Sequence, residues 1–457
     1  MRFDLPSHNS EFPMMREESN KRDLSPEKIL PTQIRDILAS TTPGSEVEVS
    51  GTVLSIRDQK NRAFIVLGQG NDQVQVVVEK SIVPDFTPPS RGSFITVTGE
   101  VVENQNTKTS NKEIIASQID VVSTPSRELV LESLAHPPKL SLDTALDNRS
   151  EHLRNVHIQS IFKVNSIVAR SFQDTMEELG FTQIFSPKIL GGGSEGGAEV
   201  FTLDYFGQTA SLAQSPQLYK QISAAAFGGV YEIGPVFRAE NSQTSRHLTE
   251  FTGLDFEVSH VESVHQLMDI EEKFIRKMFS DVAEKGAAAL ATSNHILDKV
   301  PDDIPRLTFK EATALIEEAG TQSDGRNFDQ AIGKAVMDKF NSPFVFIYEY
   351  PRDERPFYTK PLPNDPEHTQ SFDLIYKGIE LSSGAIRINT VYELKESMIA
   401  KGLDPENYPG YIAAYELGMP NHGGGGMGLQ RITQQILGLE NVREATLFPR
   451  DTKRLAP

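Results

Sequence analysis

Residues 234–257, GPVFRAENSQTSRHLTEFTGLDFE, concentrate side chains that could bind a nucleoside triphosphate. Arg238 precedes a polar turn, and Arg246, His247 and Phe251 follow it. Cationic side chains suit phosphates, and an aromatic ring suits a base. A charged hairpin at a solvated sheet edge would contain the same residues, so this segment alone leaves both interpretations open.

A second segment favours the nucleotide interpretation. Residues 422–432 read HGGGGMGLQRI, a pattern that predicts a glycine-rich turn delivering Arg431 at the start of an apolar helix. Glycine allows the backbone to approach a nucleotide closely. Together the two segments resemble motifs 2 and 3 of the class II aminoacyl-tRNA synthetases, in detail the aspartyl-tRNA synthetases (subclass IIb) of the archaeal and eukaryotic cytoplasmic type.

The resemblance implies an ATP site in which Arg238 and Arg431 are the catalytic residues. Arg238 would hold the α-phosphate and the attacking carboxylate, and His247 would face the γ-phosphate. Phe251 would stack under the adenine, with Arg431 on its other side. The implied ATP-binding residues are Arg238, Glu240, Arg246, His247, Leu248, Phe251, Glu380, Gly428 and Arg431.

Two acids, Asp373 and Glu380, lie in SFDLIYKGIELSSGAIRI. The stretch FDLIYKGIEL is predicted to be one strand, on which the two acids would point to opposite faces, so a bulge or bend between them is needed for them to converge. The resemblance implies that they hold Mg²⁺ against the phosphates, and a hard cation prefers oxygen ligands. Without the surrounding motif, two unrelated surface acids would explain the pattern.

The amino-acid pocket is predicted from Gln217 and Lys220 in LAQSPQLYKQ, which share a face if helical, and from Arg387 in GAIRI. Two cations suit a side-chain carboxylate, whereas an amide substrate would leave buried charge unpaired. Lys220 therefore indicates aspartate. The segment SEGGAEVF resembles a closing loop, although an ordinary glycine-rich surface loop is the alternative. The implied aspartate-binding residues are Ser194, Glu195, Gln217, Lys220, Ser383 and Arg387.

Alternating apolar residues in five runs between Ser45 and Ser123 predict short strands. Such strands suit a five-stranded barrel of the oligonucleotide-binding (OB) type, and half of a sandwich fits nearly as well. Its position before a synthetase-like region favours the barrel, predicted over residues 31–123 as an anticodon-binding domain. The resemblance places Phe64 and Gln75 against anticodon bases.

The rest of the chain predicts an α+β catalytic domain, residues 146–457, built on an antiparallel sheet flanked by helices. A hinge is expected at 124–145, and a disordered extension at 1–30. The helix from Ile161 and the strand FTQIFSPKI resemble motif 1, which implies a homodimer interface around Pro187. An ordinary helix packed on a sheet is the alternative.

Composition restricts the class of protein. The chain has 457 residues, no cysteine and a net charge of −18, which excludes disulfides and argues mildly against indiscriminate nucleic-acid binding. The N-terminus resembles neither a signal peptide nor a transit sequence, and no apolar run is long enough to span a bilayer. We expect a cytoplasmic enzyme with no membrane partner, whose substrates are ATP with Mg²⁺, L-aspartate and tRNA(Asp).

Several positions depart from the family pattern. Gly68 stands where an arginine is usual, Ser123 where an acid is usual, and Gln430 where motif 3 carries a carboxylate. The barrel segment from Glu46 to Ser123 holds seven Lys and Arg against ten Asp and Glu. Two alternatives to the ligase therefore stay open: a paralogue that activates aspartate but charges tRNA weakly or not at all, and a non-catalytic synthetase-like protein that binds RNA or regulates.

Overall fold

The computed structural model describes residues 33–70, 72–107, 109–191, 200–241, 244–293, 295–320 and 327–456. The predicted extension at 1–30 lies outside the described residues. Contacts divide the described chain after Arg127 into two units, a division that falls inside the predicted hinge. In the part of the chain that the structure describes, no helix is both long and apolar enough to cross a membrane.

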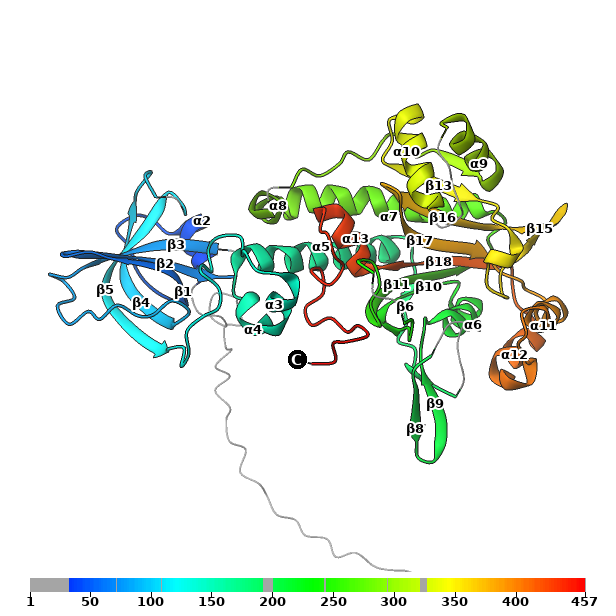
Figure 1. Cartoon of the computed structure of the whole chain (residues 1–457), viewed down its shortest axis with the longest axis horizontal. Helices are drawn as coiled ribbons and strands as arrows, with labels where there is room; N and C mark the ends of the chain where they lie inside the picture. The colour runs from blue at the N-terminus through cyan, green and yellow to red at the C-terminus, as the bar shows by residue number, and fades with distance from the viewer. Residues whose placement is uncertain are drawn as a thin grey trace, which may run out of the picture. The chain divides into compact units, whose positions relative to one another are not determined.

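The first unit is a closed five-stranded barrel preceded by helix α2 (Ile34–Ser40), coloured blue to cyan in Figure 1. The strands follow the order β1-β2-β3-β5-β4, and β1 pairs with both β2 and β4, which closes the sheet. Inward-facing valine, isoleucine and leucine side chains fill the interior. The prediction of an OB-type barrel is confirmed; the strands are β1 (Glu46–Asp58), β2 (Arg62–Gln69), β3 (Asp72–Glu79), β4 (Phe94–Glu103) and β5 (Lys112–Ser123).

The second unit is built on an eight-stranded sheet, in the order β12-β13-β16-β17-β18-β11-β10-β6. The central pairs are antiparallel, as predicted, and only the outer pairs β12–β13 and β10–β6 are parallel. The strands are β6 (Thr182–Gln183), β10 (Gly229–Phe237), β11 (Glu250–Ser259), β12 (Arg306–Thr308), β13 (Phe344–Tyr348), β16 (Ser371–Tyr376), β17 (Ile379–Ile386) and β18 (His422–Gly428).

The two faces of this sheet are covered differently. Phe256, Phe346 and Leu374 point to one face, where α5 (Val156–Glu178) and α7 (Val264–Lys285) form the main core with them (Figure 1). The strand period of two sends alternate residues to the opposite face, where α9 (Phe309–Glu318) and α10 (Phe328–Phe340) cover β13 and β16. Helix α6 (Gln217–Phe227) covers β10 and β11 on that same face. The nucleotide pocket described below lies on this same face, lined in part by Phe251 and Gly428 at the ends of β11 and β18.

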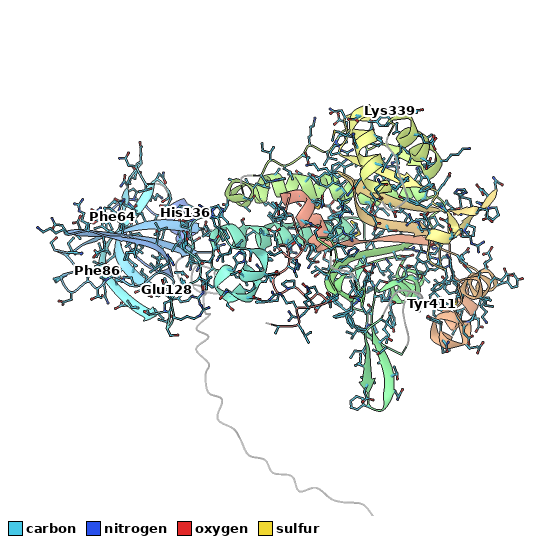
Figure 2. All side chains as sticks on the ribbon, in the orientation of Figure 1. Phe64, Phe86, Glu128, His136, Lys339 and Tyr411 are labelled. Atoms are coloured by element: carbon cyan, nitrogen blue, oxygen red, sulfur yellow. The ribbon has the colours of Figure 1, made fainter. Side chains whose placement is uncertain are left out.

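The remaining elements lie around this sheet. A small sheet of β7 (Ile189–Leu190), β8 (Thr202–Tyr205) and β9 (Gln208–Leu212) carries a hairpin that extends away from it, and β14 (Pro361–Leu362) pairs with β15 (Asp365–Thr369) (Figure 1). Aromatic residues join α11 and α12 to α6, with Tyr411 on α12 (Figure 2). The helices are α3 (Leu142–Asp147), α4 (Arg149–His152), α8 (Ala287–Ser293), α11 (Val391–Ala400), α12 (Pro409–Glu416) and α13 (Leu429–Leu437).

Two local predictions were wrong. HGGGGMG is the strand β18 and not a turn, since it pairs with both β11 and β17. Its glycines are explained by close packing, because an added Cβ would clash with neighbours on either face of the strand. FDLIYKGIEL is not one strand: Lys377 and Gly378, with φ of 49° and 73°, form a turn between β16 and β17. These left-handed φ values reverse the chain into a hairpin.

Candidate functional site

The predicted nucleotide residues line one pocket at the open face of the sheet. β10 leads into Arg238, and β11 returns through Phe251, so that the two strands present both sides of the motif 2 hairpin. The pocket has a volume of about 560 Å³, part of it open to solvent. Its lining includes all the predicted ATP residues except Glu380, namely Arg238, Glu240, Arg246, His247, Leu248, Phe251, Gly428 and Arg431.

Gly428 lies beside both Phe251 and Arg431. A Cβ placed on Gly428 would be 3.7 Å from Arg431 Cβ and 3.8 Å from the Phe251 ring, so a larger residue here would enter the space between the two. The guanidinium of Arg238 lies 5.5 Å from the centre of the Phe251 ring. The pocket therefore combines an aromatic platform with cations.

His247 is held beside this pocket by Thr244, whose hydroxyl lies 2.5 Å from the imidazole Nδ1. Burial lowers the pKa of His247; Glu240 opposes this effect, and the nearby arginines add to it. A neutral imidazole is therefore favoured while the pocket is empty. Phosphate oxygens would supply the negative charge that protonation needs.

Two buried cations meet next to this pocket. Lys220 on α6 is 2% exposed, and its Nζ donates to Asp255 Oδ1 at 2.8 Å and to the carbonyl of Gly425 at 3.0 Å. Arg387, 4% exposed, donates to both oxygens of Glu257 at 2.9 and 3.1 Å. Burial alone would lower the pKa of Arg387, but the Glu257 carboxylate outweighs it and raises the pKa. An acid therefore accompanies each of these buried cations.

Helix α6 begins at Gln217, which places Gln217 and Lys220 on the same side, as predicted from their spacing. Gln217 is buried, and its Nε2 has no hydrogen-bond partner among the described residues. An unpaired buried amide is uncommon and indicates a missing ligand or water. Ser194 and Glu195 lie outside the described residues.

The predicted acid pair converges through a hairpin and a bulge. Asp373 on β16 lies opposite Ser383 on β17, and the register shifts after Leu374, so that Ile375 faces Glu380. Residues 373 and 375 share a face, and the extra residue in β17 therefore brings Glu380 to the same side as Asp373. The predicted bulge is confirmed, although a turn reverses the chain as well.

The charge around Glu380 is mixed. Burial, followed by the charge of Asp373, raises the pKa of Glu380 to about 7, while Arg431 opposes the shift. Arg431 Nη1 lies 3.9 Å from Glu380 Oε1 and donates to the Glu380 carbonyl at 3.2 Å. The Glu380 side chain is 41% exposed, so solvent in the cleft moderates the shift. Asp373 differs, because Arg355 binds both its oxygens at 2.9 and 2.7 Å.

These residues fit a magnesium ion that is shared with a substrate. The described residues hold no cluster of three or more acidic or imidazole groups placed for a metal. Mg²⁺ in phosphate-transfer sites is commonly held by one or two carboxylates together with phosphate oxygens. Glu380 and the remaining lone pairs of Asp373 supply such a donor set.

Asp255, Glu257 and Arg355 were not predicted from the sequence. A signal existed for the first two, since Phe251, Gly253, Asp255 and Glu257 alternate along β11 and so share its open face. No comparable signal pointed to Arg355, which follows a short 3₁₀ turn at Arg352–Glu354 in an irregular stretch.

Gln430 joins the two nucleotide motifs. Its Oε1 accepts from the Thr252 backbone N–H at 3.0 Å, and its Nε2 donates to the Thr252 hydroxyl at 3.2 Å. Thr252 follows Phe251 in the chain, so this pair fixes α13 beside the aromatic platform. The amide uses both its donor and its acceptor. A carboxylate has no donor, so it could keep the second contact only if the Thr252 hydroxyl turned to donate.

On the barrel, Phe64 and Gln75 lie on the outer face of β2 and β3 (Figure 2 labels Phe64). The Arg57 guanidinium lies 4.8 Å from the centre of the Phe64 ring, and Gln75 Nε2 donates to Glu113 Oε2 at 2.7 Å. A Cβ on Gly68 would be 2.5 Å from Leu54 Cδ1. Leu54 therefore fills the space that a side chain at position 68 would need.

Comparison with known proteins shows the family of this chain. The family profile "tRNA synthetases class II (D, K and N)" matches residues 141–452, and "OB-fold nucleic acid binding domain" matches residues 47–122. The aspartate–tRNA(Asp/Asn) ligase of Methanopyrus kandleri is 39% identical, with 92% of this chain and 98% of that protein covered. The aspartate–tRNA(Asp) ligase of Pyrococcus abyssi is 36% identical, with 91% and 97% covered.

Solved structures show the same architecture. An aspartyl-tRNA synthetase from Entamoeba histolytica superposes with a TM-score of 0.83 at 31% identity, covering 98% of this chain and 96% of that one. An asparaginyl-tRNA synthetase from Pyrococcus horikoshii, complexed with asparaginyl-adenylate, gives a TM-score of 0.83 at 26% identity, covering 91% and 97%.

Proposed function

The chain belongs to the class II tRNA synthetases of the D, K and N group, and from this premise we propose that it is an aspartate–tRNA ligase. It would activate L-aspartate with ATP to aspartyl-adenylate, releasing diphosphate, and then transfer aspartate to the 3′ end of tRNA(Asp). Relatives named aspartate–tRNA ligases cover more than nine-tenths of the chain.

The observation that carries the choice of aspartate is the buried pair Lys220 and Arg387 beside the nucleotide pocket. An incoming side-chain carboxylate can accept from both Lys220 and Arg387, while Asp255 and Glu257 offer partners to the substrate ammonium. Asparagine would leave part of this buried charge without a partner, at a cost of several kcal/mol.

The same geometry supports adenylate formation. The reacting carboxylate and the α-phosphate are both anionic, so Arg238 must neutralise charge where they meet. Phe251 and Arg431 hold the base, and positioning the two substrates supplies most of the acceleration. Glu380 and Asp373 would hold Mg²⁺, which would neutralise the phosphate oxygens and the departing diphosphate.

We propose that the enzyme is a homodimer that meets its copy around Pro187. Ser186 and Lys188 on either side both bind Glu232, at 2.7 and 2.6 Å, which fixes this segment on β10. Phe185 and Ile189, on either side of Pro187, are then left 80% and 48% exposed, and neighbouring exposed apolar side chains on a fixed segment favour a partner surface. We also propose that the enzyme works in the cytoplasm, where ATP, aspartate and tRNA(Asp) are all present.

One preparation and two assays test the function. ATP–pyrophosphate exchange with aspartate, run beside charging of tRNA(Asp), should give activity in both, and asparagine should support neither. Exchange without charging would instead identify an aspartate-activating paralogue, an alternative that the excess of acidic residues in the barrel supports. Absence of both activities would identify a non-catalytic protein.

A further inference from the structure

Arg355 joins two predicted site residues that lie on neighbouring strands. Its Nη1 donates to Asp373 Oδ1 and to Ser383 Oγ, both at 2.9 Å, and its Nη2 donates to Asp373 Oδ2 at 2.7 Å. Asp373 and Ser383 are directly opposite each other in the register of β16 and β17. One planar guanidinium therefore fixes a carboxylate and a hydroxyl at once.

Arg355 is itself held in place. Its guanidinium carbon lies 3.8 Å from the centre of the Tyr350 ring, and Tyr350 packs against Phe309 and Phe328. These aromatic residues belong to the cluster that attaches α9 and α10 to the sheet. The side chains of Arg355 and Asp373 are only 10% and 8% exposed, so water replaces little of this interaction.

We propose that Arg355 is a positioning residue for activation, one that sets Asp373 and Ser383 for the amino acid and for the metal-bound phosphates. This inference rests on the proposed function, because it concerns the same cleft. A guanidinium bound to both oxygens fixes the rotation of a carboxylate, which a single contact cannot do. Without Arg355, Asp373 would be a buried anion close to a second acid, Glu380.

The test uses Arg355→Met in the full-length protein. Binding of a non-hydrolysable sulfamoyl analogue of aspartyl-adenylate is measured by calorimetry in EDTA, and exchange kinetics are measured separately for aspartate and ATP. We expect the analogue to bind about 10- to 100-fold more weakly, the range for lost hydrogen bonds to charged groups. KM for aspartate should rise similarly, and KM for ATP in the Mg²⁺-dependent exchange reaction should rise as well, since Arg355 sets Ser383 for the amino acid and Asp373 for the metal-bound phosphates.

Arg352→Met is the matched control, an arginine of the same irregular stretch whose loss should leave every value within twofold. Because Arg355 affects the metal-bound phosphates through Asp373, the double variant Arg355→Met/Asp373→Asn should raise KM for ATP no more than Asp373→Asn alone. Arg355→Lys keeps the cation but not the fork, and it should show an intermediate loss. If the Arg355→Met variant fails to fold, the Arg355→Lys variant provides the test.

Near-wild-type binding in a folded Arg355→Met or Arg355→Lys variant would overturn the proposal. So would multiplication of the two single losses in the double variant, because Arg355 would then act independently of Asp373. A wild-type protein that does not bind the analogue would instead contradict the proposed function. The two failures are therefore distinguishable.

Discussion

At the scale of single residues, Lys220 is already paired with Asp255 and 2% exposed. Its replacement by alanine removes the cation for the substrate and leaves a buried acid unpaired. We expect Lys220→Ala to raise KM for aspartate about 100-fold or more while KM for ATP changes less than threefold. Exchange kinetics measure both KM values, and Lys310→Ala, which replaces an exposed lysine on α9, is the control. Unchanged aspartate kinetics would contradict the pocket assignment.

Glu271 on α7 is a second residue whose charge has a measurable effect. It lies under β17, where its Oε2 accepts from Ser382 and its Oε1 has no partner among the described residues. Burial raises the pKa of Glu271 to about 8, although the Ser382 hydrogen bond opposes the shift. The folded protein therefore keeps a proton that an unfolded glutamate loses near pH 4.5.

The free energy of unfolding should consequently fall as pH rises from about 4.5 to 8, by up to about 1.4 kcal/mol per pH unit from this group. Glu271→Gln stays neutral and still accepts from Ser382. The Tm of this variant relative to the wild type should thus increase between pH 5 and pH 8. Glu284→Gln, an exposed acid of the same helix, should show no such trend, and a constant difference for Glu271→Gln would refute the assignment.

At the scale of elements, the turn between β16 and β17 determines where the two acids meet. Gly378 has a φ of 73°, and a Cβ there would lie 2.9 Å from Gln330 Cα on α10. Gly378→Ala combines left-handed strain with a clash against backbone. We expect it to lower stability by about 2–4 kcal/mol and to reduce exchange activity, because Asp373 and Glu380 flank the turn.

Gly402→Ala separates these two causes. Gly402 has a similar φ of 76° with no atom within 4 Å of an added Cβ. It should therefore cost only the strain, about 1–2 kcal/mol, as measured by chemical unfolding. Equal losses at the two positions would mean that the contact with α10 is unimportant.

At the scale of the whole molecule, activation and tRNA recognition are assigned to different units. Phe64→Ala on the barrel should leave aspartate-dependent exchange unchanged, because the residues proposed to contact ATP and aspartate lie in the second unit. It should raise KM for tRNA(Asp) in charging by about 5- to 100-fold, the range for one lost base stack. Phe94→Ala, a partly exposed phenylalanine on β4, is the control. A loss of exchange would contradict this division.

Much of the fold could be predicted because apolar periodicity reports burial. Alternation in Ser45–Ser123 predicted the barrel, and helical spacing from Ile161 predicted α5. The structure of the glycine run at 423–426 was harder to predict, since such a run fits both a turn and a strand whose two faces are crowded. Only the register of β18 with β11 and β17 distinguishes the two.

Much of the site could be predicted as well, but not its charge balance. Arg238, Phe251 and Arg431 were recognised as one constellation, and they line one pocket. The partners Asp255 and Glu257 were overlooked although their alternation was visible. The Arg355–Asp373 pair could not have been predicted, because contacts between an irregular segment and a distant strand leave no periodic trace in sequence.

Strand β18 has one consequence for how this chain tolerates variation. A Cβ on Gly424 would lie 2.5 Å from Glu257 Oε2, and one on Gly425 would lie 2.4 Å from Glu271 Oε1. Ordinary strands tolerate replacement at every second position, where side chains reach solvent. In a saturation library, larger residues should instead be rejected at all four positions 423–426. Variants at Gly424 and Gly426, which face Glu257 and Asp255, should lose catalysis, whereas variants at Gly423 and Gly425, which face the core, should lose stability.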